Sequence, residues 1–261
     1  MQLNECRAVV TGASGGIGRA LVPVLAAGGA RLLLVGRTAA ALEQMAAAYP
    51  GQIEWVVADI RERVGREAVQ SAARRFSGIN ALINAAGVNQ FSLLDQQDEE
   101  AIAELVQLNV TATLQLTHRL LPILRQQGRA LVVNIGSTFG SIGYPGFTAY
   151  CASKFAIRGF SEALRRELAD TQVKVLYLAP RATRTSMNSD SVVAMNTELK
   201  VAMDDPQLVA STVRAAIESE REELYMGWPE KLFVRLNGLL PRVVDQALRK
   251  QLPVIQRFAR K

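Results

Sequence analysis

Short apolar runs rich in β-branched residues alternate with amphipathic stretches along most of this 261-residue chain. The apolar runs are typical of strands buried on both faces of a parallel sheet, and the stretches between them have the spacing of helices with one apolar face. We predict strands at 7–11, 30–35, 53–58, 81–87 with its terminal turn, 129–135 and 173–178, and helices at 19–27, 39–49, 64–76, 99–121, 150–169 and 207–219.

This alternation predicts an α/β fold, a single-domain doubly wound parallel sheet of the Rossmann type flanked by helices. A short run at 223–226 is typical of a further strand, and no linker or repeat interrupts residues 1–228. The segment 186–205 is polar and weakly periodic. Its methionines, Met187, Met195 and Met203, could form an adaptable wall of a substrate lid or pack a helix against the core.

The composition excludes several classes of protein. Hydrophobic residues make up 49% of the chain and charged residues 21%, as in ordinary globular domains. Two cysteines, Cys6 and Cys151, provide neither a disulfide framework nor a metal-ligand cluster. The first residues lack the layout of a signal peptide, and no apolar run reaches the ~18 residues of a membrane span. We therefore expect a cytoplasmic protein without a metal site.

The net charge of +6 is concentrated at the C-terminal end. Residues 231–261 contain eight basic side chains and one acidic side chain, so the rest of the chain is close to neutral and does not resemble a surface that coats nucleic acid. Apolar residues recur in this segment at helical spacing, and 229–261 is predicted to be a basic amphipathic extension. It either packs over the domain or a second subunit, covering an apolar substrate entrance, or lies on a membrane surface.

A glycine-rich turn joins the first predicted strand to the first predicted helix. Gly12, Gly16 and Gly18 would let the backbone approach a pyrophosphate closely, and the helix N-terminus would offer unpaired N–H groups to it. Such a turn can also be only a tight connection. Its position after the first strand favours dinucleotide binding.

The end of the second predicted strand distinguishes between two dinucleotides. An acidic residue at this point typically binds the ribose hydroxyls of NAD, whereas an arginine accommodates the 2′-phosphate of NADP. Here Gly36 is followed by Arg37, whose guanidinium can bind phosphate oxygens with two hydrogen bonds. The sequence therefore favours NADP(H); the alternative is that Arg37 is a solvated loop residue.

The stretch from Ser137 to Lys154 carries the candidate chemistry. Tyr150 and Lys154 have the i, i+4 spacing that places two side chains on one face of a helix. A cation beside a phenol lowers the phenol's pKa from its usual ~10, so the pair could exchange a proton with a carbonyl or hydroxyl oxygen. Ser137, at a strand end, could hydrogen-bond the same oxygen. By itself, Tyr-x-x-x-Lys is also a common chance pair on a surface helix.

Asn109 and His118 lie within the predicted helix 99–121. Asparagine is unfavourable in mid-helix because its amide competes for backbone hydrogen bonds, so Asn109 either marks a functional kink or is a tolerated surface residue. His118, the only histidine, is expected to be solvated or packed rather than catalytic.

Together these motifs resemble those of the classical short-chain dehydrogenases/reductases over roughly residues 5–225. The resemblance implies that Tyr150 is the catalytic acid/base, with Ser137 polarising the substrate oxygen. It implies that Lys154 lowers the pKa of Tyr150 and binds the nicotinamide ribose, and that Asn109 holds a water linking Lys154 to solvent. The motifs are Thr11-Gly-x-x-x-Gly-Ile-Gly18, Asp59, Asn84-Ala-Ala-Gly87, Asn109, Ser137, Tyr150-x-x-x-Lys154 and 180–185.

The resemblance also implies a dinucleotide site. Ser14 and Arg37 would bind the 2′-phosphate, and Asp59 the adenine. Asn84 and Gly87 would contact the adenosine side and the nicotinamide ribose, and the segment around Thr185 the carboxamide. The implied cofactor residues are Gly12, Ser14, Gly16, Ile17, Gly18, Arg37, Asp59, Ile60, Asn84, Ala85, Gly87, Tyr150, Lys154, Pro180, Thr183 and Thr185.

Two positions depart from the family pattern. Ala85 replaces the second asparagine of the usual Asn-Asn-Ala-Gly, which is a mild change. Arg181 replaces the glycine that usually follows Pro180. Arginine there would resist a backbone shape that glycine adopts easily, or would place a cation near the cofactor or an acidic substrate group.

The sequence thus predicts an NADP(H)-dependent carbonyl reductase or alcohol dehydrogenase acting on a hydrophobic aldehyde, ketone or 3-oxoacyl group. Family resemblance implies a homodimer or homotetramer, and residues 231–261 could make peripheral contact with a membrane. Two other classes stay open. One is a non-catalytic NADP(H) sensor or scaffold, whose signature would be loss of Ser137, Tyr150 or Lys154. The other is a peripheral membrane protein that acts through its tail.

Overall fold

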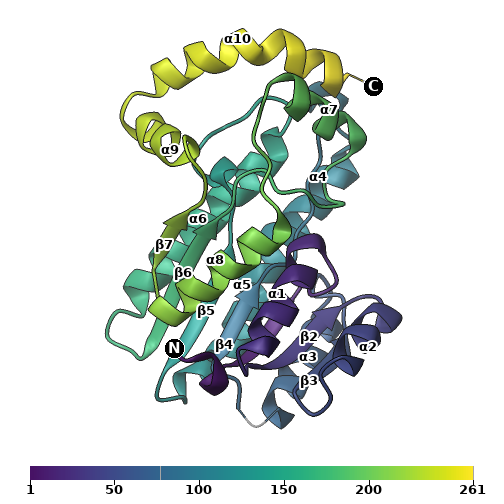
Figure 1. Ribbon diagram of the computed structural model, residues 1–261, viewed down its shortest axis with the longest axis vertical. Coiled ribbons are helices and arrows are strands. Elements are labelled where there is room, and N and C mark those ends of the chain that lie inside the picture. The colour runs from purple at the N-terminus through teal and green to yellow at the C-terminus, as the bar shows by residue number, and fades with distance from the viewer. Residues whose placement is uncertain (77, 261) are drawn as a thin grey trace.

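A parallel sheet of seven strands forms the centre of the protein (Figure 1). The computed structural model describes residues 1–76 and 78–260. In this part of the chain the strand order is β3-β2-β1-β4-β5-β6-β7, and all neighbours run parallel, which confirms the predicted doubly wound sheet. The strands are β1 (Arg7–Thr11), β2 (Arg31–Gly36), β3 (Ile53–Val57), β4 (Ala81–Asn84), β5 (Ala130–Ile135), β6 (Val173–Ala179) and β7 (Glu223–Tyr225).

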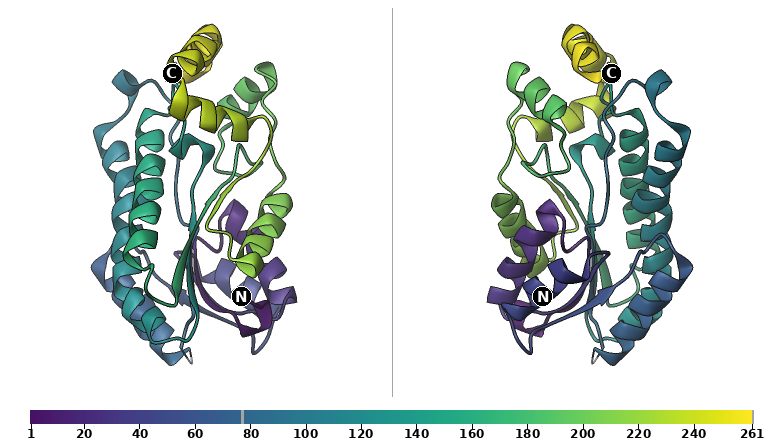
Figure 2. Two further views of the ribbon diagram at one scale, coloured as in Figure 1. Left: turned by 90° about the vertical axis from the view of Figure 1, so that its left-hand side faces the viewer. Right: turned by 90° about the vertical axis from the view of Figure 1, so that its right-hand side faces the viewer.

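Helices cover both faces of the sheet, as the side views in Figure 2 show. Residues of each strand alternate between two apolar cores: Ala8 and Val10 lie in one, and Val9 lies in the other. Because both faces of the central strands are covered, β1, β2, β4 and β5 are mostly apolar and buried, which explains their apolar runs in the sequence, whereas β3 at the edge contains exposed Glu54. One core contains α1 (Gly16–Ala27), α2 (Ala39–Ala47) and α8 (Pro206–Ser219); the other contains α3 (Arg63–Arg75), α5 (Thr113–Arg125) and α6 (Thr148–Glu167).

The helix predicted over 99–121 is divided into three parts. A π-helical segment, Gln107–Ala112, joins α4 (Glu99–Val106) to α5 and contains Asn109. Such segments often occur at functional sites. Asn109 is buried, so the interpretation of it as a surface residue is wrong and the predicted irregularity is confirmed.

The polar segment 186–205 contains a further helix, α7 (Asp190–Glu198). The Ser189 hydroxyl caps it by accepting a hydrogen bond from the Val192 N–H at 3.4 Å. Val192 and Met195, on the inner side of this helix, are buried. The sequence of α7 has too few apolar positions to show a helical period. The helix is stabilised instead by the burial of these two side chains against the rest of the domain. The remaining short elements are 3₁₀ turns at Leu3–Glu5, Leu94–Gln96 and Thr138–Gly140.

The C-terminal extension forms two helices, α9 (Glu230–Leu239) and α10 (Pro241–Ala259), at one end of the molecule (Figure 1). Val244 and Ile255 of α10 are buried, and Ile255 belongs to the same apolar cluster as the residues beneath α7. The expectation that the extension packs over the domain is therefore confirmed. Within the described residues, no helix combines the length and the apolar character needed to cross a bilayer.

At the opposite end of the sheet, the buried carboxylate of Glu220 connects several chain segments. Glu220, just after α8, pairs with Arg129 before β5, with Lys174 of β6 at 2.7 Å and with the Met1 ammonium at 2.9 Å. Although burial alone would raise its pKa, these three partners lower the pKa of Glu220 to about 2. The cluster fixes the chain segments that enter β5 and β6 to the end of α8.

Candidate active site

A cavity of about 350 Å³ lies beyond the carboxyl ends of the central strands. The segments that follow β1, β4, β5 and β6 bound it together with α7, α9 and α10. The chain reverses its direction of strand addition between β1 and β4, and open α/β sheets bind ligands at such a point. The predicted cofactor residues that line it are Gly12, Gly16, Ile17, Gly18, Ala85, Gly87, Tyr150, Lys154, Pro180, Thr183 and Thr185.

The turn between β1 and α1 forms a cradle that admits only small residues. Gly12 has φ +64°, and a Cβ there would lie 2.7 Å from the Ala86 Cα. A Cβ on Gly16 would lie 2.4 Å from the Thr185 side chain. No side chain caps the N-terminus of α1, so its N–H groups are available to an anion. These features fit the pyrophosphate of a dinucleotide.

Ser137, Tyr150 and Lys154 all line the same cavity. Ser137 follows β5 and its Oγ accepts a hydrogen bond from the Phe139 N–H at 3.1 Å, which fixes its orientation. Tyr150 and Lys154 lie in the first turns of α6. The Lys154 Nζ is buried, donates to the Ile135 carbonyl at 3.1 Å and lies 5.7 Å from the centre of the Tyr150 ring. The structure thus brings the predicted triad together, and because Lys154 is buried, the pair does not lie on the surface of the helix.

The pKa values of this pair differ from the sequence prediction. Burial raises the pKa of Tyr150 to about 12, and a hydrogen bond with Ser137 opposes the rise only in part. Burial also lowers the pKa of Lys154 to about 8. The predicted lowering of the phenol's pKa by Lys154 is therefore wrong for the protein's own groups. The physical reason is that the lysine bonds a backbone carbonyl and faces the ring, so desolvation outweighs its attraction for the phenolate.

Asn109 anchors the segment that follows β4. Its Oδ1 accepts from the Val88 N–H at 2.9 Å, while its Nδ2 donates to the Val88 carbonyl at 2.8 Å and to the Ser153 Oγ at 3.0 Å. A Cβ on Gly87 would lie 3.1 Å from this Oδ1. The π-helical segment therefore positions the amide between α6 and one wall of the cavity, next to Lys154. The proposed water relay stays a prediction.

Asn84 differs from the residues that line the cavity. Its Nδ2 donates to the Asn134 Oδ1 at 2.8 Å and to the Thr117 Oγ1 at 3.2 Å, so its side chain lies between the sheet and α5. The hydroxyl of Thr11 accepts from the N–H groups of Ala85 and Ala86 at 3.1 and 3.2 Å. The asparagine thus supports the turn, and residues 85–87 present their backbone to the cavity.

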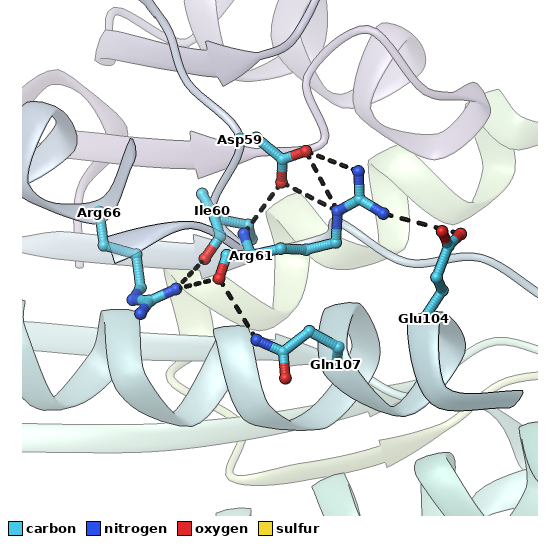
Figure 3. Close-up of polar contacts among 6 residues, drawn as sticks. All are labelled: Asp59, Ile60, Arg61, Arg66, Glu104 and Gln107. Atoms are coloured by element: carbon cyan, nitrogen blue, oxygen red, sulfur yellow. Dashed lines mark hydrogen bonds and ion pairs between the residues drawn. The ribbon is translucent and has the colours of Figure 1, made fainter. Parts of the chain in front are cut away.

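A charged cluster lies at the opposite end of the predicted dinucleotide site (Figure 3). Asp59, after β3, accepts hydrogen bonds from the Arg61 Nε at 3.1 Å and the Arg61 Nη2 at 2.7 Å. These bonds lower the pKa of Asp59, and the charge of exposed Arg37 contributes to the same shift. The Ile60 carbonyl accepts from Arg66 at 2.6 Å. The predicted cofactor residues that do not line the cavity are Ser14, Arg37, Asp59, Ile60 and Asn84, and the predicted catalytic residue Asn109 does not line it either.

Arg61 is the residue at this end that the sequence analysis missed. Its signal was available, since Asp59 and Arg61 are two residues apart after a strand end. It neutralises Asp59, so Arg37 remains as an exposed cation beside a neutral pair. The Glu104 carboxylate lies farther away, 3.7 Å from the Arg61 Nη1, and is largely exposed. The electrostatics of this end favour an anionic group.

The other half of the cavity is apolar. The rings of Phe139 and Phe147 lie 6.4 and 6.2 Å from that of Tyr150. Of the three methionines considered as a wall, Met187 and Met195 line the cavity. The Tyr144 hydroxyl donates to the Gln251 Oε1 of α10 at 3.1 Å, so the extension closes directly over this half. The apolar lining from the extension is Phe233, Val244, Ala247 and Leu248.

Arg181 joins the segment after β6 to the extension. Its Nε and Nη2 donate to the Asp204 Oδ1 at 3.0 and 2.8 Å, and its Nη1 donates to the Glu230 Oε2 at 3.2 Å. Two carboxylates therefore neutralise it, and it does not offer a free cation to an acidic substrate. Arg181 also has no positive φ, so the loop adopts ordinary backbone geometry without the usual glycine.

Two further observations concern His118 and the side chains that could bind a metal ion. His118 is exposed on α5, as the solvated interpretation predicts. Within residues 1–76 and 78–260, no group of three His, Cys, Asp or Glu side chains is arranged to hold a metal ion.

The arrangement suits proton exchange next to a bound dinucleotide. A phenol, a hydroxyl and an ammonium line one cavity between a glycine cradle and an apolar chamber. A carbonyl oxygen at that point would receive hydrogen bonds from Tyr150 and Ser137, while its apolar substituents contact the aromatic rings.

The chain is similar to proteins of known family and of known structure. Residues 7–196 match the family model described as short chain dehydrogenase. Nodulation protein G of a Rhizobium strain is 34% identical over 187 residues, which cover 71% of this chain and 76% of that protein. The 3-oxoacyl-(acyl-carrier-protein) reductase FabG of Vibrio cholerae is 28% identical over 223 residues, or 82% of this chain and 90% of that protein.

Solved structures have the same fold over nearly the whole chain. A short chain dehydrogenase from Burkholderia cenocepacia in complex with NADP has a TM-score of 0.82 and 26% identity, covering 95% of this chain and 99% of that one. A short chain dehydrogenase/reductase from Burkholderia phymatum in complex with NAD has a TM-score of 0.82 and 22% identity, covering 93% and 96%. The second similarity concerns the fold alone.

Proposed function

Because the chain belongs to the classical short-chain dehydrogenase/reductase family of oxidoreductases, which use a nicotinamide cofactor, we propose that it is an NADP(H)-dependent reductase of apolar carbonyl compounds. The observation that carries the proposal is the convergence of Ser137, Tyr150 and Lys154 on one cavity that has a glycine cradle on one side and aromatic rings on the other.

The preference for NADP(H) is supported by the adenosine end of the site. Arg37 is exposed and has no ion-pair partner among the described residues, while Arg61 neutralises the nearby Asp59. A 2′-phosphate would meet a net positive field there, whereas the ribose hydroxyls of NAD would lack the acidic partner that usually binds them. The NADP complex of the 26%-identical relative agrees with this preference.

The protein's own groups favour the direction of carbonyl reduction. When bound, the reduced nicotinamide supplies a hydride to the carbonyl carbon. The Tyr150 phenol, with a pKa of about 12, is protonated at neutral pH and donates its proton to the carbonyl oxygen. Ser137 donates a hydrogen bond to the same oxygen. The Lys154 ammonium stabilises the phenolate that is left, which takes a proton from solvent to complete the cycle.

The substrate class follows from the lining of the cavity. The walls of the substrate half come from Phe139, Phe147, Met195 and the inner sides of α9 and α10. Arg181 is held by two carboxylates, so an acidic group gains little there. We therefore propose an aldehyde, ketone or 3-oxoacyl compound whose chain is apolar. A homodimer or homotetramer is part of the same proposal and is tested by sedimentation velocity.

The deciding experiment compares Tyr150→Phe with the unchanged protein. NADPH oxidation is followed with a panel of apolar ketones, aldehydes and 3-oxoacyl thioesters. We expect the variant to lose about 10²- to 10⁴-fold in kcat/KM while NADPH binding, measured by fluorescence, is retained. Tyr49→Phe, on the far side of the sheet, serves as the control. A wild-type protein that binds NADPH but reduces no member of the panel would instead favour a sensor or scaffold, although Ser137, Tyr150 and Lys154 are all present.

A further inference from the structure

The outer surface of α9 and α10 has the chemistry of a lipid-binding face, and we propose that it docks the protein on anionic membranes. These helices form one end of the molecule, and α10 runs across that end in Figure 1. The inference does not depend on the proposed activity, although it would place the apolar half of the cavity close to a source of apolar substrates.

One side of α10 forms a basic face, which consists of Arg242 and Arg249. At 100° per residue, their spacing of seven residues places them on one side of the helix, opposite Val244 and Ile255. The latter two are buried against the domain. The basic face therefore points away from the protein.

The charges of the basic face are not used within the protein. Arg242, Arg249 and neighbouring Lys250 have no ion-pair partner among residues 1–76 and 78–260, whereas Arg257 pairs with Glu198 of α7. Asp245 is the one acidic residue within α10. A side that presents several unpaired cations and a single carboxylate complements a negatively charged surface.

An exposed apolar corner lies beside the basic face, where α9 turns into α10. It consists of Leu239, Leu240 and Val243, whose exposed fractions are 80%, 55% and 52%. None of the three lines the cavity, so substrate binding does not account for their exposure. Single exposed apolar residues are common, but three within five positions next to unpaired arginines are typical of segments that enter the membrane interface.

A membrane fits this surface better than a second copy of the chain does. A two-fold contact through this surface would bring the basic faces of two protomers together, which like-charge repulsion opposes. An anionic bilayer offers negative headgroups to the arginines and an apolar layer to Leu239. Because α10 uses its own apolar side to pack on the domain, we expect it to lie on the headgroups while only the corner inserts.

The test is flotation of the full-length protein with vesicles. One set contains phosphatidylcholine alone, and the other contains an equal mixture of phosphatidylcholine and phosphatidylglycerol. The charge variant is Arg242→Glu/Arg249→Glu. The control, Arg74→Glu/Arg75→Glu, makes the same change in net charge at two exposed arginines that end α3. Leu239→Gln tests the apolar corner.

We expect the unchanged protein and the control to float with the anionic vesicles and not with phosphatidylcholine. Each basic residue near an anionic surface contributes about fivefold to binding, so the charge variant should bind at least about 20-fold more weakly. Leu239→Gln should also weaken binding. NADPH titration of every variant should be unchanged, which separates this inference from the proposed function.

Three results would overturn the proposal. The first is absence of flotation with anionic vesicles. The second is an equal loss of binding in the charge variant and in the control, because binding would then follow net charge and not this face. The third is self-association that the charge variant or Leu239→Gln abolishes without vesicles, because the face would then be a contact between copies.

Discussion

The Arg181 side chain holds the C-terminal helices over the cavity, and its removal should measurably lower the free energy of unfolding. Arg181→Ala leaves Asp204 without the guanidinium that bonds it at 2.8 and 3.0 Å. The Asp204 side chain is only 5% exposed, and removing one partner of a buried pair costs about 3–5 kcal/mol. Arg181 itself is 17% exposed, so we expect the lower end of this range, a loss of about 3 kcal/mol.

The same substitution should loosen the extension before the whole domain unfolds. Arg181 is bonded at once to Asp204, to Glu230 at the start of α9 and to the Trp228 carbonyl. We therefore expect trypsin to cleave the variant faster at residues 231–249, and KM for apolar substrates to rise while NADPH affinity is unchanged. Urea unfolding measures the stability, and mass spectrometry of timed digests locates the cleavage.

Two variants separate the role of this side chain from a general effect of charge removal. Glu230→Gln removes only the connection to α9 and should accelerate the same cleavages at a smaller cost, about 1 kcal/mol. Arg158→Ala breaks an exposed contact of 4.0 Å with Glu223 and should change stability by less than about 0.5 kcal/mol. If Arg181→Ala were as stable as Arg158→Ala and were digested at the wild-type rate, the extension would be held by apolar packing alone.

Three other predictions concern the cofactor, the sheet and the active site. Arg37→Ala should weaken NADPH binding about 10- to 100-fold and leave NADH binding unchanged, and an equal loss for both cofactors in fluorescence titrations would refute the assignment of the 2′-phosphate. Glu220→Gln should lower the free energy of unfolding by about 3 kcal/mol near neutral pH, because the folded-state pKa of about 2 lies below the usual 4.5. The stabilisation by the carboxylate is complete above pH 4.5 and is lost as the pH falls toward 2. The stabilities of the variant and the wild type, measured by urea unfolding, should therefore converge in acid. The kcat/KM for reduction should fall as the pH rises through about 8, where Lys154 loses its proton, and Lys154→Arg should move this fall to higher pH; identical pH profiles would contradict the role of the ammonium.

The strands and most of the helices could be predicted because their local patterns are strong. The central strands of a parallel sheet covered on both faces are mostly apolar, and Val9, Leu33 and Leu82 are buried accordingly. The glycine-rich turn that begins at Gly12 and the i, i+4 pair on α6 depend on neighbours in the sequence, so their positions could also be inferred from the chain alone.

The features that could not be predicted from the sequence depend on contacts between distant segments of the chain. The pKa of Tyr150 depends on how deeply the phenol is buried by Phe139, Phe147 and the extension, which no local spacing shows. The partners of Arg181 lie 23 and 49 residues away, so its neutral environment could not be foreseen. The Asn84 side chain does not line the cavity because its amide donates to both Thr117 and Asn134, and these residues come from α5 and β5.

The wall that α9 and α10 contribute to the cavity lies outside residues 7–196, the part of the chain that matches the family model. These helices add no strand to the sheet and supply none of Ser137, Tyr150 or Lys154. One wall of the chamber is therefore encoded apart from Ser137, Tyr150 and Lys154, whereas Phe139, Phe147 and Met195 of the same chamber lie within the matched part. Exchange of residues 229–260 in chimeras would reshape this one wall and keep all three polar groups in the chain, but it would also change how deeply Tyr150 is buried.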